Sequence, residues 1–299
     1  MKKNKACIVI ISSRKKCIKH CLASLWENYN HLYNYPVFVH YFDDIYDDDQ
    51  FIKDIADSCP QKVKFKAIPY STPCFIKEEE MYYNKKNLWY VRNSFSINRK
   101  GYLHMCHFTS NMYGYENTEI DEYDYVITHD DESGYDLPLK FNPIEALDDT
   151  NVSIGAFFVG QRLKNGSPHQ GHLDTRVGLW AFTKEFLISN RIIPKSQSLK
   201  RLLLDKNAAW NFHFLEWCDT YVIKTKVFET ELWKNWITAV NKSGGIYKHR
   251  WGDNNIISIF AHIYQDEIYN FDLVHKGPHN QGKFRSLQDY APSVKDNKK

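Results

Sequence analysis

The sequence has no long hydrophobic run, and no stretch approaches the roughly 20 consecutive apolar residues that a membrane-spanning helix needs. It also lacks an excess of charge, since 39 basic residues stand against 36 acidic ones and leave a formal net charge of +3. Because basic and acidic residues are so nearly equal in number, the protein has no strong overall positive field of the kind that nucleic-acid-binding proteins use. We therefore expect no membrane span and no nucleic-acid partner.

Cysteine does not form a recognisable framework. The chain has 7 cysteines among 299 residues, an odd number in a protein too large to need disulfide staples. Cys17 and Cys21 are spaced for one helical face, but no second pair of Cys or His with zinc-finger spacing follows. The basic N-terminus precedes an apolar stretch too short for a signal-peptide core. These features favour free thiols and predict a cytoplasmic protein.

The apolar runs that are present favour an α/β fold. Residues 7–11 and 35–43 read as strands, and residues 12–33 between them have helical spacing, which predicts a right-handed parallel crossover. Further strands are predicted at 63–68, 123–132, 151–160 and 220–230. Helical spacing recurs at 76–95, 101–115, 178–192, 198–206 and 231–245, where the last helix ends at two glycines.

No internal repeat, low-complexity linker or shift in composition divides the chain. We therefore predict one α/β domain over residues 1–285, followed by a polar tail over residues 286–299. Aromatic residues make up 15% of the chain, which is compatible with a ligand such as a sugar that stacks on rings.

Three acidic residues, Asp130, Asp131 and Glu132, follow the strand that begins at Tyr123. At the carboxyl end of a strand in an α/β sheet, Asp130 and Glu132 can hold a divalent cation while the cation grips a diphosphate. Such a cation neutralises charge on a departing nucleoside diphosphate. The simpler interpretation is a solvated acidic loop, which is what we expect of residues 42–50.

A second segment, residues 241–264, separates these interpretations. It resembles the fungal α-1,2-mannosyltransferases, which extend mannose chains on glycoproteins and glycolipids. Their comparable stretch reads Gly-Gly, an aromatic pair, Glu-Arg-Trp-Gly-Asp, and then a helix beginning Ala-Pro-x-His-Ser-Ile. The residues that match in order are Gly244, Gly245, Arg250, Trp251, Gly252, Asp253, Ser258 and Ile259.

The resemblance extends along most of the chain, from the first strand to about His279. The residues that match the family's Ser-Tyr-Arg-His-Met-Cys-Arg-Phe segment are Tyr102, His104, Met105, Cys106 and Phe108. Residues 123–132 fall where the family has Tyr-Asp-Tyr-Tyr-Trp-Arg-Val-Glu-Pro-Asp. Asp130 thus takes the place of the family's metal-site Glu, and Glu132 that of its Asp.

The resemblance implies a GT-A fold, with a Rossmann-type mixed central sheet flanked by helices. It also implies Mn²⁺ or another divalent cation, GDP-mannose as donor, a glycan as acceptor, and retention at the anomeric carbon. Tyr102, Asp130 and Arg250 are assigned to the donor on this basis, and Tyr70 lies near where the family carries a Tyr close to the metal. Arg14, after the first strand, is assigned to the donor because a guanidinium pairs with phosphate oxygens; its simpler role is an ordinary charge at a helix start. The resemblance assigns Asp130 and Glu132 to the metal. His275 is the candidate third ligand, because a late His followed by Lys-Gly is similar to other metal-dependent glycosyltransferases.

Three further residues receive roles, and only that of Glu229 rests on the resemblance. Glu229 matches the candidate nucleophile or stabiliser of the anomeric centre, and Glu231 competes because this region needs a deletion to align. Without the resemblance, Glu229 reads as an outward residue on an alternating strand. Asp253 is assigned to an acceptor hydroxyl, with a helix cap as a compatible role, and Trp251 offers a ring face to the acceptor sugar.

The sequence also departs from the family. Ile257 stands at the position of the family's metal-binding His, and His262 or His275 is the candidate replacement. The alternative is a metal held without histidine, by two carboxylates, water and the diphosphate. Thr128 replaces an Arg and Asp131 a Pro, so a different GDP-sugar or a UDP-sugar stays open.

Three alternatives therefore remain. The first is an enzyme of the same fold with a different donor or acceptor, for example one that builds surface glycans. The second is a non-catalytic protein that binds a glycan or a partner protein. The third is a metal-dependent hydrolase of phosphate esters. Family members work in the Golgi lumen, so a Golgi location applies here if an anchor has been removed.

Overall fold

The computed structural model describes residues 6–12, 15–42, 49–68, 73, 76–81, 100–114, 119–135, 138–157, 175–206 and 220–271. Its centre is a seven-stranded mixed sheet with the strand order β3-β2-β1-β4-β6-β5-β7. The strands are β1 (Ala6–Ser12), β2 (Val37–Phe42), β3 (Val63–Ile68), β4 (Tyr125–Asp130), β5 (Ile154–Ala156), β6 (Tyr221–Lys224) and β7 (Tyr269–Asn270). This confirms the predicted α/β class.

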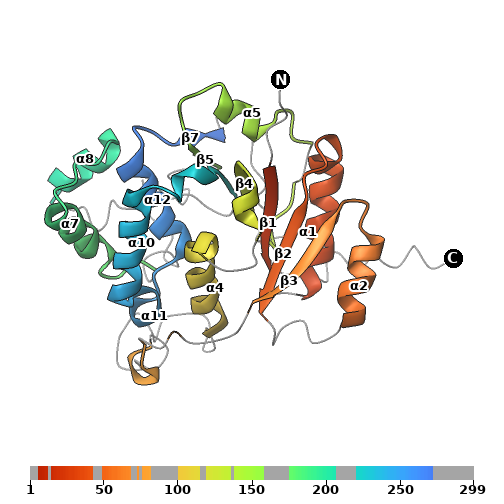
Figure 1. The fold of residues 1–299 in the computed structure, drawn as a ribbon, viewed down its shortest axis with the longest axis horizontal. Coiled ribbons are helices and arrows are strands. Elements are labelled where there is room, and N and C mark those ends of the chain that lie inside the picture. The colour runs from red at the N-terminus through yellow and green to blue at the C-terminus, as the bar shows by residue number, and fades with distance from the viewer. Residues whose placement is uncertain are drawn as a thin grey trace, which may run out of the picture.

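Helices cover both faces of the sheet (Figure 1). One face carries α1 (Lys15–Asn28) and α2 (Asp49–Ser58), and the other carries α4 (Lys100–Asn111), α10 (Glu231–Ser243) and α12 (Asp253–Tyr264). The shorter helices are α5 (Pro143–Asp148), α7 (Leu179–Ser189), α8 (Gln197–Leu204) and α11 (Gly245–His249). Single 3₁₀ turns lie at Asn30–Leu32, Glu78–Glu80, Met112–Gly114, Ile120–Glu122 and Thr225–Val227.

Alternation along the strands assigns side chains to the two faces. Ile8 and Ile10 pack with α1 in one core cluster, whereas Cys7 and Val9 pack with α4 residues in another. On β4, Ile127 faces α1 and Val126 faces α4. By the same alternation, Thr128 and Asp130 belong to the α4 face.

Strand direction is the feature that positions the site. β3, β2, β1 and β4 are parallel, but β6 runs antiparallel to β4, with Thr128 opposite Tyr221 and Tyr125 opposite Lys224. The start of β6 therefore lies beside the carboxyl end of β4. Whatever follows β6 lies at the opposite edge of the sheet.

Some predicted boundaries were wrong. The strand expected over 220–230 ends at Lys224, because a 3₁₀ turn and the N-cap Thr230, whose hydroxyl accepts from Trp233 N, begin the next helix. The strand expected over 151–160 is only Ile154–Ala156 within the described residues. In the acidic stretch 42–50, Asp49 and Gln50 already belong to α2. The tail 286–299 lies outside the described residues.

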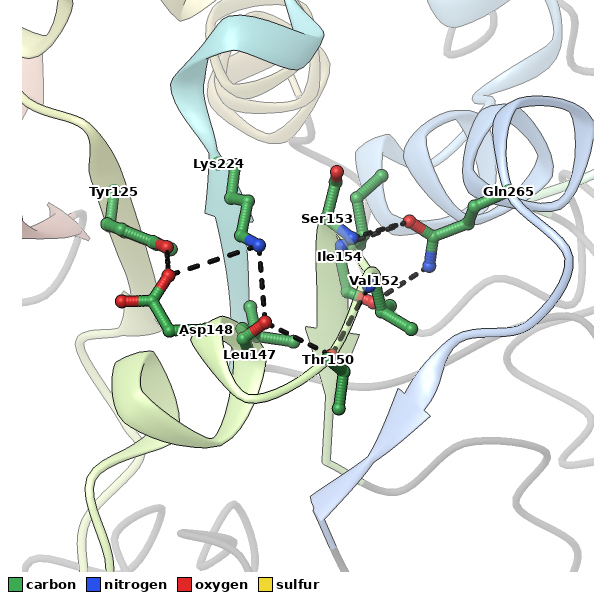
Figure 2. A network of polar contacts seen from close by, with 9 residues as sticks. All are labelled: Tyr125, Leu147, Asp148, Thr150, Val152, Ser153, Ile154, Lys224 and Gln265. Carbon is green, nitrogen blue, oxygen red and sulfur yellow. Dashed lines mark hydrogen bonds and ion pairs between the residues drawn. The ribbon is translucent and has the colours of Figure 1, made fainter.

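A polar network ties the end of α12 to β5 (Figure 2). The side-chain oxygen of Gln265 accepts hydrogen bonds from Ser153 N and Ile154 N, both at 3.1 Å. Its amide nitrogen donates to Ile154 O at 2.9 Å and to Glu267 O at 2.6 Å. Gln265 is buried, so this single side chain fixes β5 against the helix end.

The same picture shows a second, part-buried contact between neighbouring elements. Lys224 of β6 donates from Nζ to Leu147 O at 3.2 Å, and its Nζ lies 4.0 Å from Asp148 Oδ1. The hydroxyl of Tyr125 donates to the same Asp148 carboxylate. Both contacts lie at the amino end of β4, away from Asp130.

Among the described residues, no helix is long and apolar enough to cross a membrane.

Candidate functional site

The acidic cluster lies at the carboxyl ends of two adjacent central strands. Asp130 ends β4 and is paired in register with Ile11 of β1. Asp131 is buried, and its Oδ2 accepts from Ser12 Oγ at 3.1 Å. The main chain of Asp130 is held as well, since its carbonyl accepts from Ser133 N at 3.1 Å and from Cys21 Sγ at 3.6 Å. Asp131 is therefore committed to β1, and the ends of the two strands are locked together.

The thiol beside this cluster is kept neutral. Burial raises the pKa of Cys21 well above its usual value, and the nearby carboxylates of Asp131 and Asp130 raise it further. Cys21 thus adds no negative charge to the acidic end of β4.

A second half of the site is the turn between α11 and α12. Arg250 caps α11 with φ of 61°, a left-handed conformation that is uncommon for a residue with a side chain. Its guanidinium carbon lies 4.7 Å from the centre of the Tyr102 ring. A Cβ built on Gly252 would lie 3.5 Å from the Tyr102 hydroxyl. Tyr102 of α4 therefore lies against both Arg250 and Gly252.

Asp253 joins this half of the site through a cysteine. The Cys106 thiol has hydrogen-bonding contacts with Tyr102 and with Asp253, and its pKa is raised by burial and then by the Asp253 charge. The structure thus brings Tyr102 together with Arg250 and Asp253, which the sequence analysis selected from two separate segments. Asp253 is the first residue of α12 and Gly252 is its N-cap, so the predicted cap is one residue off.

Tyr221 connects the acidic cluster and the turn, and sequence reasoning missed it. Thr128 Oγ1 donates to Tyr221 O at 3.2 Å, which fixes the first residue of β6 beside β4. Burial raises the pKa of the Tyr221 hydroxyl, and the carboxylates of Asp253 and, more weakly, Asp130 raise it further. Both carboxylates therefore lie within electrostatic reach of this neutral phenol. In the sequence, Tyr221 is only one aromatic residue on a short strand.

Trp251 does not present an open ring face, which corrects its assignment to the acceptor. Its side chain is buried in the largest core cluster, and its Nε1 donates to Val177 O at 2.7 Å. Phe182 packs on it with 5.0 Å between ring centres. The ring also lies directly on Gly245, which explains why a glycine stands there.

This packing predicts that Gly245→Ala destabilises the protein by about 1–3 kcal/mol. A Cβ at Gly245 would meet three Trp251 ring atoms at 2.2–2.4 Å, all in a ring fixed by Val177. The measurement is the free energy of unfolding in urea. Gly101→Ala is the matched control, because no atom lies within 4 Å of its added Cβ. Equal stability of the two variants would contradict the packing described here.

Glu229 lies at the wrong edge of the sheet for its assigned role. It follows the 3₁₀ turn after β6, where Thr225 N donates to Asp124 O at 2.9 Å, and it is exposed. β4 spans roughly 17 Å between that edge and Asp130. Glu231 lies beyond it, exposed and paired with Lys234. A carboxylate beside Asp130 from this part of the chain has to precede β6, and residues 207–219 lie outside the described residues.

The histidine expected at the metal site is not found among the described residues. Ile257 is buried in the core of α12. His262 is nine residues beyond Asp253, or about 13 Å along the helix, and its Nδ1 lies 2.8 Å from the hydroxyl of Ser196, the N-cap of α8. His262 therefore serves the α8–α12 contact. Arg14, Tyr70 and His275 lie outside the described residues.

The carboxylates at the end of β4 suit a hard cation whose other ligands are not protein side chains. The described residues contain no group of three or more His, Cys, Asp or Glu side chains arranged to hold a metal. Asp130 and Glu132 flank Asp131, whose Oδ2 accepts from Ser12. Carboxylate oxygens with water and phosphate oxygens are the usual ligands of Mg²⁺ and suit Mn²⁺. Asp130 and Glu132 thus fit a cation that is shared with a diphosphate.

Comparison with known proteins gives a family match over nearly the whole chain. Residues 1–274 match the family model described as glycolipid 2-alpha-mannosyltransferase. The chain is 24% identical over 261 residues to the O-glycoside alpha-1,2-mannosyltransferase omh1 of Schizosaccharomyces pombe, covering 85% of this chain and 63% of that protein. It is also 24% identical over 259 residues to glycolipid 2-alpha-mannosyltransferase 2 of Candida albicans, covering 83% and 52%. The chain thus spans about half to two thirds of these relatives.

Solved structures share the fold. The crystal structure of core-mannan synthase A from Aspergillus fumigatus, in its Mn/GDP form, aligns with a TM-score of 0.72 at 16% identity, covering 89% of this chain and 71% of that one. The mannosyltransferase Ktr4p from Saccharomyces cerevisiae aligns with a TM-score of 0.68 at 18% identity, covering 88% and 67%. These similarities confirm the GT-A fold expected from the sequence.

Proposed function

Because the chain belongs to the glycolipid 2-alpha-mannosyltransferase family, we propose that it transfers mannose from GDP-mannose to a hydroxyl of a glycan. The single observation that carries this proposal is the arrangement around Tyr221. Tyr221 is hydrogen-bonded to Thr128 of β4 and lies in the same core cluster as Trp251 of the turn, where Arg250 stacks on Tyr102.

In this proposal, the acidic end of β4 holds the cation. Asp130 and Glu132 supply carboxylate oxygens, and Asp131 fixes the strand end through Ser12. A bound Mn²⁺ or similar ion would neutralise the charge that develops on the departing diphosphate.

The turn supplies the donor and acceptor contacts. The Arg250 guanidinium, stacked on Tyr102, can form paired hydrogen bonds with phosphate oxygens. Asp253, at the start of α12, can accept a hydrogen bond from an acceptor hydroxyl. Retention at the anomeric carbon is part of the proposal and rests on family membership. Thr128 and Asp131, which depart from the family pattern, are the positions to examine if another nucleotide sugar is used.

A thermal-melting experiment tests the donor site. A ligand at 100 times its dissociation constant stabilises the folded state by about 2.7 kcal/mol. We expect Mn²⁺ with GDP to raise the melting temperature, UDP to raise it less, and Asp130→Ala/Glu132→Ala to abolish the shift. An Asp149→Ala variant, altered at an exposed aspartate, should keep it. Absence of any shift in the unmodified protein would oppose the proposal.

One observation favours a second candidate, a non-catalytic protein that binds glycan. Ile257 is buried and cannot ligate a metal where the family has His. That candidate predicts binding of mannosides without any effect of Mn²⁺ or GDP on melting. A phosphate-ester hydrolase is less well supported, because the described residues offer no cluster of three metal-binding side chains.

The fold also makes a prediction about Glu229. Glu229→Ala should leave the transfer rate within about twofold of the unmodified protein, because Glu229 is exposed at the far edge of the sheet. The check is the initial rate at saturating donor and acceptor, with Glu185→Ala, at an exposed glutamate of α7, as the matched control. A loss of 100-fold or more on Glu229→Ala alone, about 2.7 kcal/mol of barrier, would place this carboxylate at the reacting centre after all.

A further inference from the structure

Residues 175–177 cross the α11–α12 turn and are tied to it at several points. Thr175 O accepts from Gly252 N at 3.0 Å and from Asn255 Nδ2 at 3.1 Å. The same Asn255 nitrogen donates to Thr175 Oγ1 at 3.0 Å. Two residues further on, Val177 O accepts from Trp251 Nε1 at 2.7 Å.

Arg176 stands between these two anchors. Because both neighbours are bonded to the turn, the main chain of Arg176 has to lie alongside residues 251–255. Only 6% of Arg176 is exposed, the same fraction as for Arg250. A guanidinium keeps its charge at any ordinary pH, and burying it is costly unless other groups compensate the charge.

Charge is distributed unevenly over the site. The end of β4 carries three carboxyl groups, at Asp130, Asp131 and Glu132, whereas the turn with its crossing segment carries two arginines, Arg176 and Arg250, and one acid, Asp253. One side therefore attracts a cation and the other an anion. A diphosphate bound to a divalent cation satisfies both sides at once.

We propose that Arg176 is a second arginine of the donor site, which binds the diphosphate together with Arg250 and is positioned by the Asn255–Thr175 contact. This inference rests on the proposed function. Neither Arg176 nor Asn255 stands out in the sequence, because Arg176 follows a stretch without a clear pattern and Asn255 reads as a helix-start residue.

The test compares GDP with GMP by isothermal titration in the presence of Mn²⁺. The two nucleotides differ by one phosphate, so the ratio of their dissociation constants isolates what the protein gains from the diphosphate. Arg176→Met keeps the length of the side chain and removes its charge. We expect this variant to lower the GDP preference by about tenfold, as the loss of a charged hydrogen bond implies. Arg201→Met, at an exposed arginine of α8, should leave it unchanged.

Two further variants cover the case in which Arg176→Met fails to fold. Arg176→Lys keeps the charge but loses the paired geometry, and Asn255→Ala releases the crossing segment without changing any charge. Both should lower the GDP preference by several-fold. An unchanged preference in a folded Arg176→Met, or in both Arg176→Lys and Asn255→Ala, overturns the proposal. If the unmodified protein binds neither nucleotide, the proposed function itself has failed.

Discussion

Asp130→Asn is expected to lower the rate of mannosyl transfer by about 100- to 1000-fold. The substitution keeps the shape of the side chain but removes the charge that would hold the cation at the end of β4. Stabilisation of several kcal/mol by a bound cation corresponds to a rate factor of that size. The fold should survive, because β4 is held by its neighbours β1 and β6 and by the Ser12–Asp131 hydrogen bond.

The measurement for Asp130→Asn is the initial rate of transfer as a function of Mn²⁺ concentration. Asp149→Asn is the control, since Asp149 is an exposed aspartate at the end of α5, at the amino edge of the sheet. We expect this control to match the unmodified protein. If folded Asp130→Asn keeps both its rate and its Mn²⁺ dependence, the acidic end of β4 is not the cation site.

Gln265→Ala should cost about 3–5 kcal/mol of stability, the largest effect we expect from one substitution far from the site. The side chain makes four hydrogen bonds to main-chain groups, one of them to Glu267 and the other three to Ser153 and Ile154, which Figure 2 shows. Removing it leaves the buried amides of β5 and the Ile154 carbonyl without these partners. Each buried polar group that loses its partner costs about 1–3 kcal/mol, partly relieved by water at the rim.

Urea unfolding checks this prediction. Gln197→Ala, at an exposed glutamine in the first turn of α8, is the matched control and should change stability by less than about 0.5 kcal/mol. A loss below about 1 kcal/mol for Gln265→Ala would show that β5 does not depend on this side chain. Nucleotide binding by the folded fraction should be unaffected, because Gln265 lies at the opposite end of α12 from Asp253.

Local pattern predicted much of the fold. The apolar runs of β1, β2 and β4 and the helical spacing of α1 and α4 are strong signals, and the acidic cluster at the end of β4 follows directly from them. The family resemblance brought in Arg250 and Asp253, which lie together with Tyr102 in the structure. These predictions succeed because short segments carry their own periodicity.

Strand direction is what the sequence does not contain. The pattern of residues 220–230 is compatible with a strand in either direction, and only the antiparallel register with β4 shows that Glu229 is far from Asp130. The same register brings Tyr221 between the two halves of the site. The prediction for Trp251 was wrong for a different reason. Its ring faces the core because it packs against Gly245 and Phe182, and these residues meet it only in the folded chain.

The most direct test of the central claim is transfer itself. The purified chain is incubated with Mn²⁺, a mannoside acceptor and either GDP-mannose or a panel of other nucleotide sugars, and the products are analysed by mass spectrometry and NMR. Our account predicts that one mannose is added in an α-linkage, from GDP-mannose only, and that this transfer requires Mn²⁺ and Asp130. No transfer from any nucleotide sugar by the folded protein would contradict it.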